Sequence, residues 1–419
     1  MNGTNIVGAT NAALGFLSAA LTNAGTYSVM VSNPGGSVTS SNAVLAVRSP
    51  GAPFIRVDGQ LVVSSVSNVA VAMVTIESGY SNGVVFYTLD GSTPDFVSPI
   101  YSSPVVLTSN AVVRAMGLNV DTFDTAEAPA VSVSILFPVT ATTAGGGNVN
   151  VNPNQALHLS GSIPSVSATP SAGWTFLHWQ GDATGTANPL NLPVTGPKNV
   201  SAVFGTTLQT GAIGSGAIEL SATNLIPYGT LVRATAIPNS GSYFAQWGSA
   251  LTGTNSPAWF SVVSTNPVRA VFGTLQAGQA ALSVRIVGAG NVSVNPQQQV
   301  YAVNDNVTLT ATPQDEYYGF NGWSGDASST TNPLSLTLSS SKVVTANFSL
   351  LPPTLGISQQ GSSVVLNWPV VYSNYFLLDA TALTVATWNT NTSAKTNLGD
   401  NITVTMPLTN DQTYFRLVQ

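Results

Sequence analysis

The sequence of 419 residues contains no cysteine and very few charged residues. Without cysteine the chain can form no disulfide framework, and no thiolate can serve as a nucleophile or metal ligand. Charged residues make up 6% of the chain, against about a quarter of an average soluble domain, so Asn, Thr and Ser must supply much of the polar surface. The lack of cysteine is compatible with both the cytosol and the exterior of a cell.

Basic clusters and long apolar runs are also missing. The 10 basic residues are scattered singly among 16 acidic ones, and the formal net charge is −6. We therefore expect no nucleic-acid partner, because such a partner requires a basic patch. No stretch approaches the roughly 18 apolar residues of a membrane-spanning helix. Residues 1–20 lack the basic start of a signal peptide, so we expect either that export is not needed or that the true start lies upstream.

Residues suited to acid–base chemistry are scarce. The only histidines, His158 and His178, form no HExxH arrangement, no serine stands in a GxSxG motif, and the Gly-rich turns lack the lysine of a phosphate loop. The acidic clusters at 121–127 and 315–316 lie in turn-like segments and are interpreted as solvated loops rather than as the carboxylate pair of a glycosidase. We predict no catalytic residue, no cofactor and no metal site.

Alternating apolar and polar residues recur along almost the whole chain. Examples are TYSVMVS at 26–32, VVFYTL at 84–89 and VTLTAT at 307–312, bounded by Gly, Pro, Asn and Ser. This period is typical of strands, and helical periodicity is weak and confined to 12–20. The length indicates several domains. The sequence therefore predicts an all-β protein of tandem small β-sandwich and β-grasp-like modules in an extended array.

One pattern occurs three times in the sequence. It reads FLHWQGDATGTANPL at 176–190, FAQWGSALTGTNSPA at 244–258 and FNGWSGDASSTTNPL at 320–334. Each copy follows a Gly-rich turn and a strand that ends in proline, and each is closed by a strand that ends in phenylalanine. The tryptophans Trp179, Trp247 and Trp323 are 68 and 76 residues apart. Periods of this size indicate tandem structural units.

The repeated tryptophans can be core residues or platforms that stack on sugar rings. We favour the core, because each small module needs a large buried side chain. A phenylalanine three residues before each tryptophan breaks the strand alternation and predicts a bulge between them. Asp182 and Asp326 follow in two copies, whereas the middle copy has Ala250. We expect these carboxylates to accept backbone N–H groups in a turn; hydrogen bonding to a sugar is the alternative.

The full pattern resembles the divergent internalin-type B repeat, a small bacterial surface module. The resemblance rests on the Gly-turn, Val-x-Val-Asn-Pro, Thr-Pro, Phe-x-x-Trp-x-Gly-Asp, Asn-Pro-Leu and Val-x-Ala-x-Phe elements. It implies a first repeat at 138–205, a second at 206–274 and a third at 275–350. The second repeat departs from the pattern at the Gly-Asp and Asn-Pro-Leu positions.

The regions on either side of the repeats resemble other modules. Residues 52–137, with VVFYTLDGSTP at 84–94, are similar to the C-terminal domain of chitobiases and β-hexosaminidases, which accompanies glycosidases without supplying their catalytic residues. Its Asp-Gly-Ser-Thr-Pro segment predicts an Asx-type turn. Residues 351–419 resemble a fibronectin type III-like domain, in which we expect Trp368 and Phe415 to be core residues.

Residues 1–48 resemble the second half of an immunoglobulin-like domain. In that resemblance Asn-Ala-Gly-Thr-Tyr at 23–27 forms a tyrosine corner, and Val29 stands where the second Cys of a disulfide-bonded relative would be. The strands of the first half and their packing tryptophan are missing, because the first tryptophan of the chain is Trp174. We therefore expect this chain to be the C-terminal piece of a longer protein or its start to be misplaced.

Together these resemblances imply a function outside the cell without catalysis. We expect an extracellular spacer or adhesion region of a bacterial surface or secreted protein. The alternative is a carbohydrate-binding accessory region of a secreted polysaccharide-degrading enzyme whose catalytic domain lies upstream. Expected partners are a polysaccharide, a cell-surface glycan or other surface proteins. Trp174 and Trp388 are the candidates for stacking on a glycan.

The extended arrangement can be tested by small-angle X-ray scattering. A compact globule of this length should have a radius of gyration of about 22 Å. Six strand-built units in a row should exceed about 40 Å, because each unit is roughly 25–30 Å long. Folding back at the predicted linkers, Pro50–Pro53 and Pro352–Pro353, would give intermediate values, and a value near that of the globule would contradict the expectation.

Overall fold

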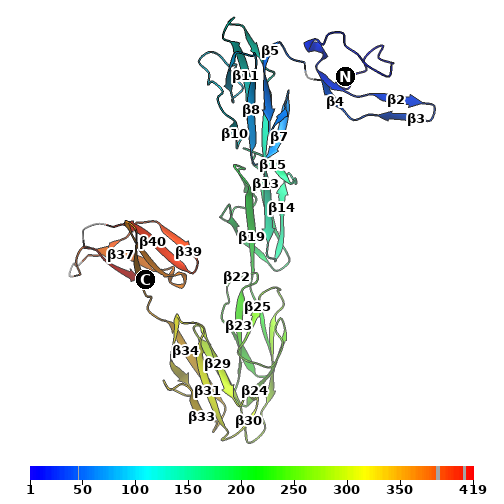
Figure 1. The fold of residues 1–419 in the computed structure, drawn as a ribbon. Helices are drawn as coiled ribbons and strands as arrows, with labels where there is room; N and C mark the ends of the chain where they lie inside the picture. The colour runs from blue at the N-terminus through cyan, green and yellow to red at the C-terminus, as the bar shows by residue number, and fades with distance from the viewer. Residues whose placement is uncertain (46, 384–386, 409–411) are drawn as a thin grey trace. The chain divides into compact units, whose positions relative to one another are not determined.

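The structure is a computed structural model that describes residues 1–45, 47–383, 387–408 and 412–419 (Figure 1). It divides into two compact units, Met1–Gly205 and Thr206–Gln419. The all-β prediction is confirmed, since the only helical elements in the described ranges are the 3-10 turns η1 (Leu21–Asn23) and η2 (Val370–Tyr372). Within these ranges, no helix is long and apolar enough to cross a membrane.

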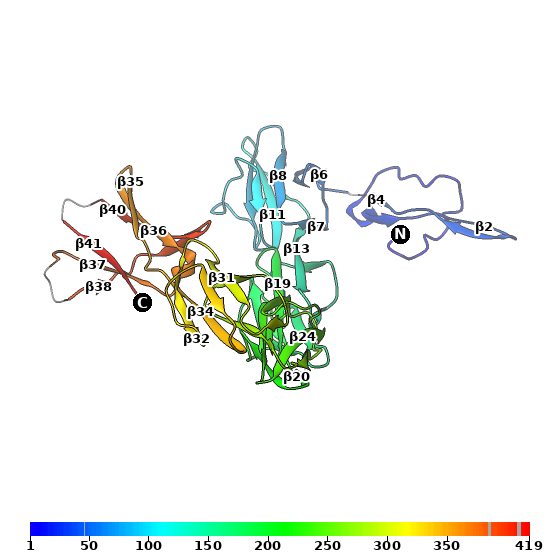
Figure 2. The same cartoon turned by 90° about the horizontal axis from the view of Figure 1, so that it is seen from below.

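The first unit begins with two short strand pairs. Antiparallel pairing joins β1 to β4 and β2 to β3, with bounds β1 Gly25–Tyr27, β2 Met30–Asn33, β3 Gly36–Thr39 and β4 Ala43–Leu45. Figure 2 shows β4 close to the N-terminus, with β2 further along the same segment. The Tyr27 hydroxyl donates to the Asn23 carbonyl at 2.7 Å, which is the hydrogen bond expected of a tyrosine corner. Val29 and Val31 are 58% and 62% exposed, so no second sheet covers this part of the described chain.

Residues 51–136 form a β-sandwich. One sheet has the order β10-β8-β5-β6; the other has the order β12-β11-β13, with β9 beside β11 and β7 beside β13. Its first strand includes Pro53, so the linker predicted at Pro50–Pro53 is wrong beyond residue 50. The bounds are β5 Gly51–Val57, β6 Gln60–Leu61, β7 Ser65–Val69, β8 Ala72–Gly79, β9 Gly83–Thr88, β10 Val105–Leu107, β11 Ala111–Asn119, β12 Thr125–Glu127 and β13 Val131–Thr143.

Strand β13 joins this sandwich to the first repeat without a break. Its residues 131–133 pair with β11 and 132–136 with β7, whereas 139–143 pair in parallel with β19 (Lys198–Thr206) of the repeat. One hydrophobic core runs from Ile55 in the sandwich to Phe204 in the repeat. The boundary predicted between 137 and 138 therefore lies inside a strand that both modules share.

All three repeats have the same topology of two layers of three strands, and in the first repeat one of these layers is part of a nine-stranded sheet that also contains strands of the preceding sandwich. In each, the first and last strands pair in parallel and the strand with the repeated tryptophan pairs with the last strand. A β-grasp fold also pairs its first and last strands in parallel, but here a second sheet rather than a helix covers the first, so each repeat is a small sandwich.

The first repeat contains β13-β19-β17 and β14-β16-β18, the second β20-β26-β24 and β21-β23-β25, and the third β28-β34-β32 and β29-β31-β33. The bounds are β14 Gly147–Asn152, β15 Leu157–Leu159, β16 Ser165–Pro170, β17 Thr175–Gly181, β18 Leu190–Asn191, β20 Thr210–Ile213, β21 Gly216–Leu220, β22 Ile226–Pro227, β23 Leu231–Pro238, β24 Ser242–Ser249, β25 Ala258–Ser261, β26 Val268–Thr274, β27 Gln279–Ala280, β28 Leu282–Val287, β29 Gly290–Asn295, β30 Tyr301–Ala302, β31 Asn306–Pro313, β32 Tyr318–Gly325, β33 Leu334–Thr337 and β34 Lys342–Leu350.

The C-terminal region is a further two-sheet module. Its sheets have the orders β35-β36-β40-β39 and β38-β37-β41. Trp368 is 1% exposed in its core, as predicted, and Phe415 is half-buried against that core. The bounds are β35 Gly356–Gln360, β36 Ser363–Pro369, β37 Phe376–Ala380, β38 Asn389–Thr390, β39 Lys395–Leu398, β40 Asn401–Pro407 and β41 Tyr414–Val418.

A glycine begins the second strand of each repeat because an aromatic ring lies against its backbone. A Cβ atom built on Gly147, Gly216 or Gly290 would come within 2.5 Å of the ring of the closing phenylalanine, which is Phe204, Phe272 and Phe348 in turn. Real Cβ contacts are not this short. The repeated glycine and the repeated closing phenylalanine therefore form one packing unit.

Substituting Gly290 by Ala should destabilise the third repeat. The new methyl group must displace the Phe348 ring in a filled core, which we expect to cost about 1–3 kcal/mol. Hydrogen exchange of peptides from residues 282–350 measures the effect locally. Asn291→Ala is the control because Asn291 is exposed on the same strand. Equal protection in wild type and Gly290→Ala would contradict this packing.

Candidate functional site

The three repeated tryptophans are buried. Trp179, Trp247 and Trp323 are 1%, 3% and 3% exposed, which confirms the prediction that they are core residues. Each indole N–H donates to a backbone carbonyl of the loop that follows, at 2.8, 2.7 and 2.9 Å to Ala187, Asn255 and Thr331. The rings therefore offer no free face for a sugar.

The predicted bulge is present in all three repeats. The pairing register shifts between Phe176 and His178, and at the equivalent places in β24 and β32. This shift brings the phenylalanine and the tryptophan to the same side of the strand. Their ring centroids are 5.1, 4.8 and 5.1 Å apart in the three repeats, and the phenylalanine also contacts the closing phenylalanine at 6.0, 6.2 and 5.5 Å.

The aspartates that follow hold the backbone of the last strand. Asp182 accepts the N–H of Asn199 at 2.6 Å, and Asp326 accepts that of Val343 at 2.7 Å. As expected, each carboxylate accepts a backbone N–H, although the donor lies 17 residues away rather than in a local turn. The second repeat has Pro267 at the donor position, which has no N–H to give. Its loss of the carboxylate at Ala250 therefore costs no hydrogen bond.

The asparagine of Asn-Pro-Leu extends a β-ladder with its side chain. The Asn188 amide donates to the Ala168 carbonyl at 2.7 Å and accepts the Ala168 N–H at 2.9 Å. Asn332 does the same to Ala311. Ser256 of the second repeat accepts the Ala236 N–H at 2.8 Å. The repeated polar residues thus complete the backbone hydrogen bonding of each module.

The two candidate glycan-stacking residues lie in different surroundings. Trp174 is half-buried, packs against the core of the first repeat and lies close to Gly146. Trp388 is half-buried in the C-terminal module, and the Arg416 guanidinium lies 4.3 Å from its ring centroid. An arginine at this distance covers one ring face.

The few titratable residues are spread over the chain. His158 is buried on β15 with its Nδ1 3.4 Å from the Gln155 amide, and His178 is an exposed strand residue. Glu127 lies on strand β12 and pairs with Arg114 at 2.8 Å, so its placement in a loop was wrong. The described residues contain no group of three or more His, Asp or Glu that could hold a metal ion.

The Asp-Gly-Ser-Thr-Pro turn has the Asx chemistry predicted for it. The Asp90 carboxylate accepts the Ser92 N–H at 2.9 Å and also the Ser92 hydroxyl. These hydrogen bonds hold the pKa of Asp90 below its ordinary value, although the group is exposed. This carboxylate therefore stabilises a turn.

The second and third repeats contact each other through polar groups. The buried Arg233 guanidinium donates from Nη2 to the Ile286 carbonyl at 2.6 Å and from Nη1 to that of Gly288 at 3.4 Å. These carbonyls lie on and just beyond the edge strand β28. Burial of the Arg233 guanidinium lowers its pKa. Glu219 pairs with Arg285 at 3.0 Å. Together these bonds hold the two repeats against one another.

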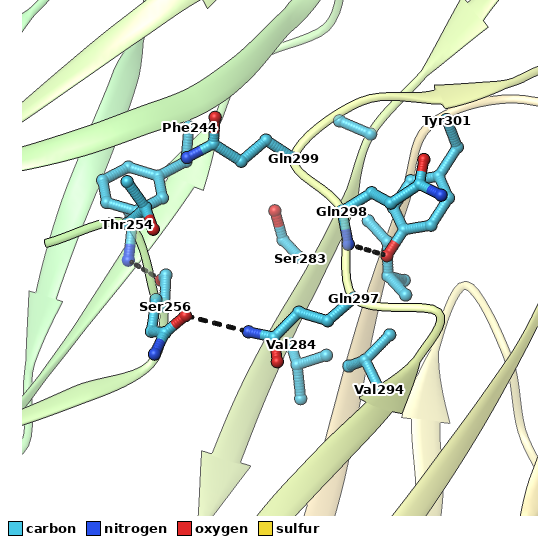
Figure 3. Close-up of a pocket in the computed structure, with 14 residues that line it drawn as sticks. Phe244, Thr254, Ser256, Ser283, Val284, Val294, Gln297, Gln298, Gln299 and Tyr301 are labelled. Carbon is cyan, nitrogen blue, oxygen red and sulfur yellow. Dashed lines mark hydrogen bonds between the residues drawn. The ribbon is translucent and has the colours of Figure 1, made fainter.

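A cleft of about 370 Å³ lies between these two repeats (Figure 3). Gln297 and Gln299 reach across it, to the Asn255 side chain at 3.0 Å and to the Ala245 carbonyl. None of its lining residues is acidic, basic or histidine. Burial raises the pKa of the lining Tyr301 phenol, which stays neutral at neutral pH. Sequence reasoning missed this cleft; the run of three glutamines at 297–299, without a counterpart in the other repeats, was the available signal.

Four of the described modules match models of known protein families. Residues 137–207, 206–274 and 282–352 each match the divergent InlB B-repeat domain, and residues 66–126 match the chitobiase/beta-hexosaminidase C-terminal domain. The chain thus contains three such repeats and one such domain in tandem. No curated protein matches the chain. The immunoglobulin-like and fibronectin type III-like resemblances stay predictions.

Replacing either aspartate should weaken its repeat, whereas adding one to the second repeat should not help. We expect Asp326→Ala to cost about 1–3 kcal/mol, because the Val343 N–H loses a charged acceptor. Ala250→Asp is the matched reverse change and should gain nothing, since Pro267 offers no N–H. Thermal unfolding with and without calcium measures both. A calcium-dependent rise in Tm that Asp326→Ala removes would show instead that the carboxylate binds metal.

Proposed function

We propose that this chain is a non-catalytic, extracellular spacer and adhesion region of a bacterial surface or secreted protein. The observation that supports it is the use of the repeated residues. The tryptophans fill the cores, and the aspartates and asparagines bond to backbone groups of their own modules. The repeated polar residues of this chain therefore stabilise the modules in which they lie. B-repeat and chitobiase C-terminal-type domains are typical of proteins outside the cell.

The spacer proposal is tested with purified full-length chain and a panel of chromogenic glycosides and dyed polysaccharides. We expect no product above the rate without protein, because a glycosidase needs two carboxylates in one cleft and the cleft between the second and third repeats is lined by no Asp or Glu. Hydrolysis that persists through a second, independent purification would contradict the proposal. The wild-type chain and its Asp326→Ala variant should be equally inactive.

The second candidate function is carbohydrate binding on behalf of a polysaccharide-degrading enzyme. The match to the chitobiase/beta-hexosaminidase C-terminal domain favours it. Trp388 is the stronger aromatic candidate. Arg416 covers only one face of its ring, and the side chain remains partly exposed for contact with a sugar. Trp174 is the weaker one, because its ring packs on a core.

Pull-down on insoluble polysaccharides tests these two residues. If the C-terminal module supplies the platform, Trp388→Ala should weaken binding roughly 5- to 100-fold, the range expected when an aromatic stack is lost. Phe123→Ala is the control, since Phe123 is a 78% exposed aromatic residue on another module. Trp174→Ala should lower Tm as well as any binding. Unchanged binding by Trp388→Ala would exclude it as the platform.

A further inference from the structure

The cleft between the second and third repeats has the composition of a binding site rather than of a packing gap. Its apolar walls include Phe244, Val284 and Val294, and the rest of its lining is rich in hydroxyl and amide groups. A pure packing defect would be lined by apolar atoms and would stay dry. Its volume of about 370 Å³ is near the lower end of that of small-molecule sites, which is about 300–1,000 Å³.

Several polar groups in the cleft have no partner in the protein. The Gln298 side-chain amide and the hydroxyls of Thr254 and Ser283 make no hydrogen bond within the residues that the structure describes. Figure 3 shows Ser283 between the glutamine loop of the third repeat and the Thr254–Ser256 segment of the second. An amide and hydroxyls offer donors and acceptors together, which suits ligand hydroxyl groups that do both.

The cleft is also held in shape before any ligand arrives. Gln297 and Gln299 bond across it, and the Arg233 contacts to β28 fix the two repeats at its side. A binding site that is already formed loses less conformational entropy when a ligand binds. Both repeats contribute lining residues, so neither forms the cleft alone.

We propose that this cleft binds a short segment of a neutral polysaccharide. The proposal rests on the carbohydrate-binding candidate function above and gives it a second, separate location. The walls provide apolar contact for sugar ring faces, and the unpartnered amide and hydroxyl groups bond to sugar hydroxyls. An acidic glycan or a phosphorylated ligand would find no basic lining residue to pair with its charge. A lipid chain would leave the polar groups buried without partners.

The test is isothermal titration of the full chain with neutral oligosaccharides, namely the hexamers of cellulose, xylan, chitin and starch. Hyaluronan and oligogalacturonate fragments serve as acidic counterparts. We expect at least one neutral series to bind and the acidic ones not to bind. Gln298→Ala and Thr254→Ala should each lower the affinity about 2- to 10-fold, as expected for one lost hydrogen bond. Both residues are exposed, so neither change should affect folding.

Gln314→Ala is the matched control, because Gln314 is an exposed glutamine of the same repeat outside the cleft. It should leave the affinity within 2-fold. Hydrogen exchange with and without the bound hexamer gives an independent location, and protection should rise at 251–256 and 294–301.

Three outcomes would overturn the proposal. Binding that survives Gln298→Ala with Thr254→Ala but is lost with Trp388→Ala would leave the carbohydrate-binding function intact and move its site elsewhere. Binding to none of the glycans would remove both. Preferential binding of an acidic glycan, or of unstructured peptides included as a further arm, would show that the chemistry of the cleft has been assigned to the wrong ligand class.

Discussion

A single buried indole determines the structure of each repeat. The tryptophan lies in the core between two layers of strands, where its cross-strand neighbour is a small residue, Ala202, Ala270 or Ala346. An indole N–H without an acceptor in the core would cost free energy, and the loop that follows places a carbonyl opposite each of these three. The backbone N–H of the same tryptophan bonds to Gly185, Gly253 or Ser329 in the same loop. One side chain therefore fixes a strand, a bulge and a loop.

Much of this architecture could be predicted because the chain contains three versions of it. The tryptophan, the phenylalanine before the bulge, the glycine and the closing phenylalanine recur at fixed distances, and packing between them explains the recurrence. The aspartate could be assigned a backbone N–H partner because a carboxylate after a Trp-x-Gly turn commonly accepts such groups. That its partner is the second residue of the last strand needed the structure, which also explains why Ala250 and Pro267 occur together.

Other features depend on contacts for which the sequence carries no signal. Strand β13 continues through Pro138, a residue that usually ends a strand, because its pairing partners change on either side of that point. The cleft between the second and third repeats is built from residues up to 65 positions apart, from Ala236 to Tyr301, and Arg233, which stabilises its borders, has no counterpart in the other repeats. Repetition within a chain reveals what the modules share and says little about what lies between them.

The repeated tryptophans and aspartates that build the modules are therefore distinct from the residues that line the cleft between the second and third repeats. The most direct measurement of the central claim of this account is hydrogen exchange of the indole N–H groups, followed by NMR on the full chain. The account predicts slow exchange for Trp179, Trp247 and Trp323, whose N–H groups are buried and bonded to carbonyls, and fast exchange for the exposed Trp259. Fast exchange at the three repeated positions would show that these rings lie at the surface, and the account would be wrong.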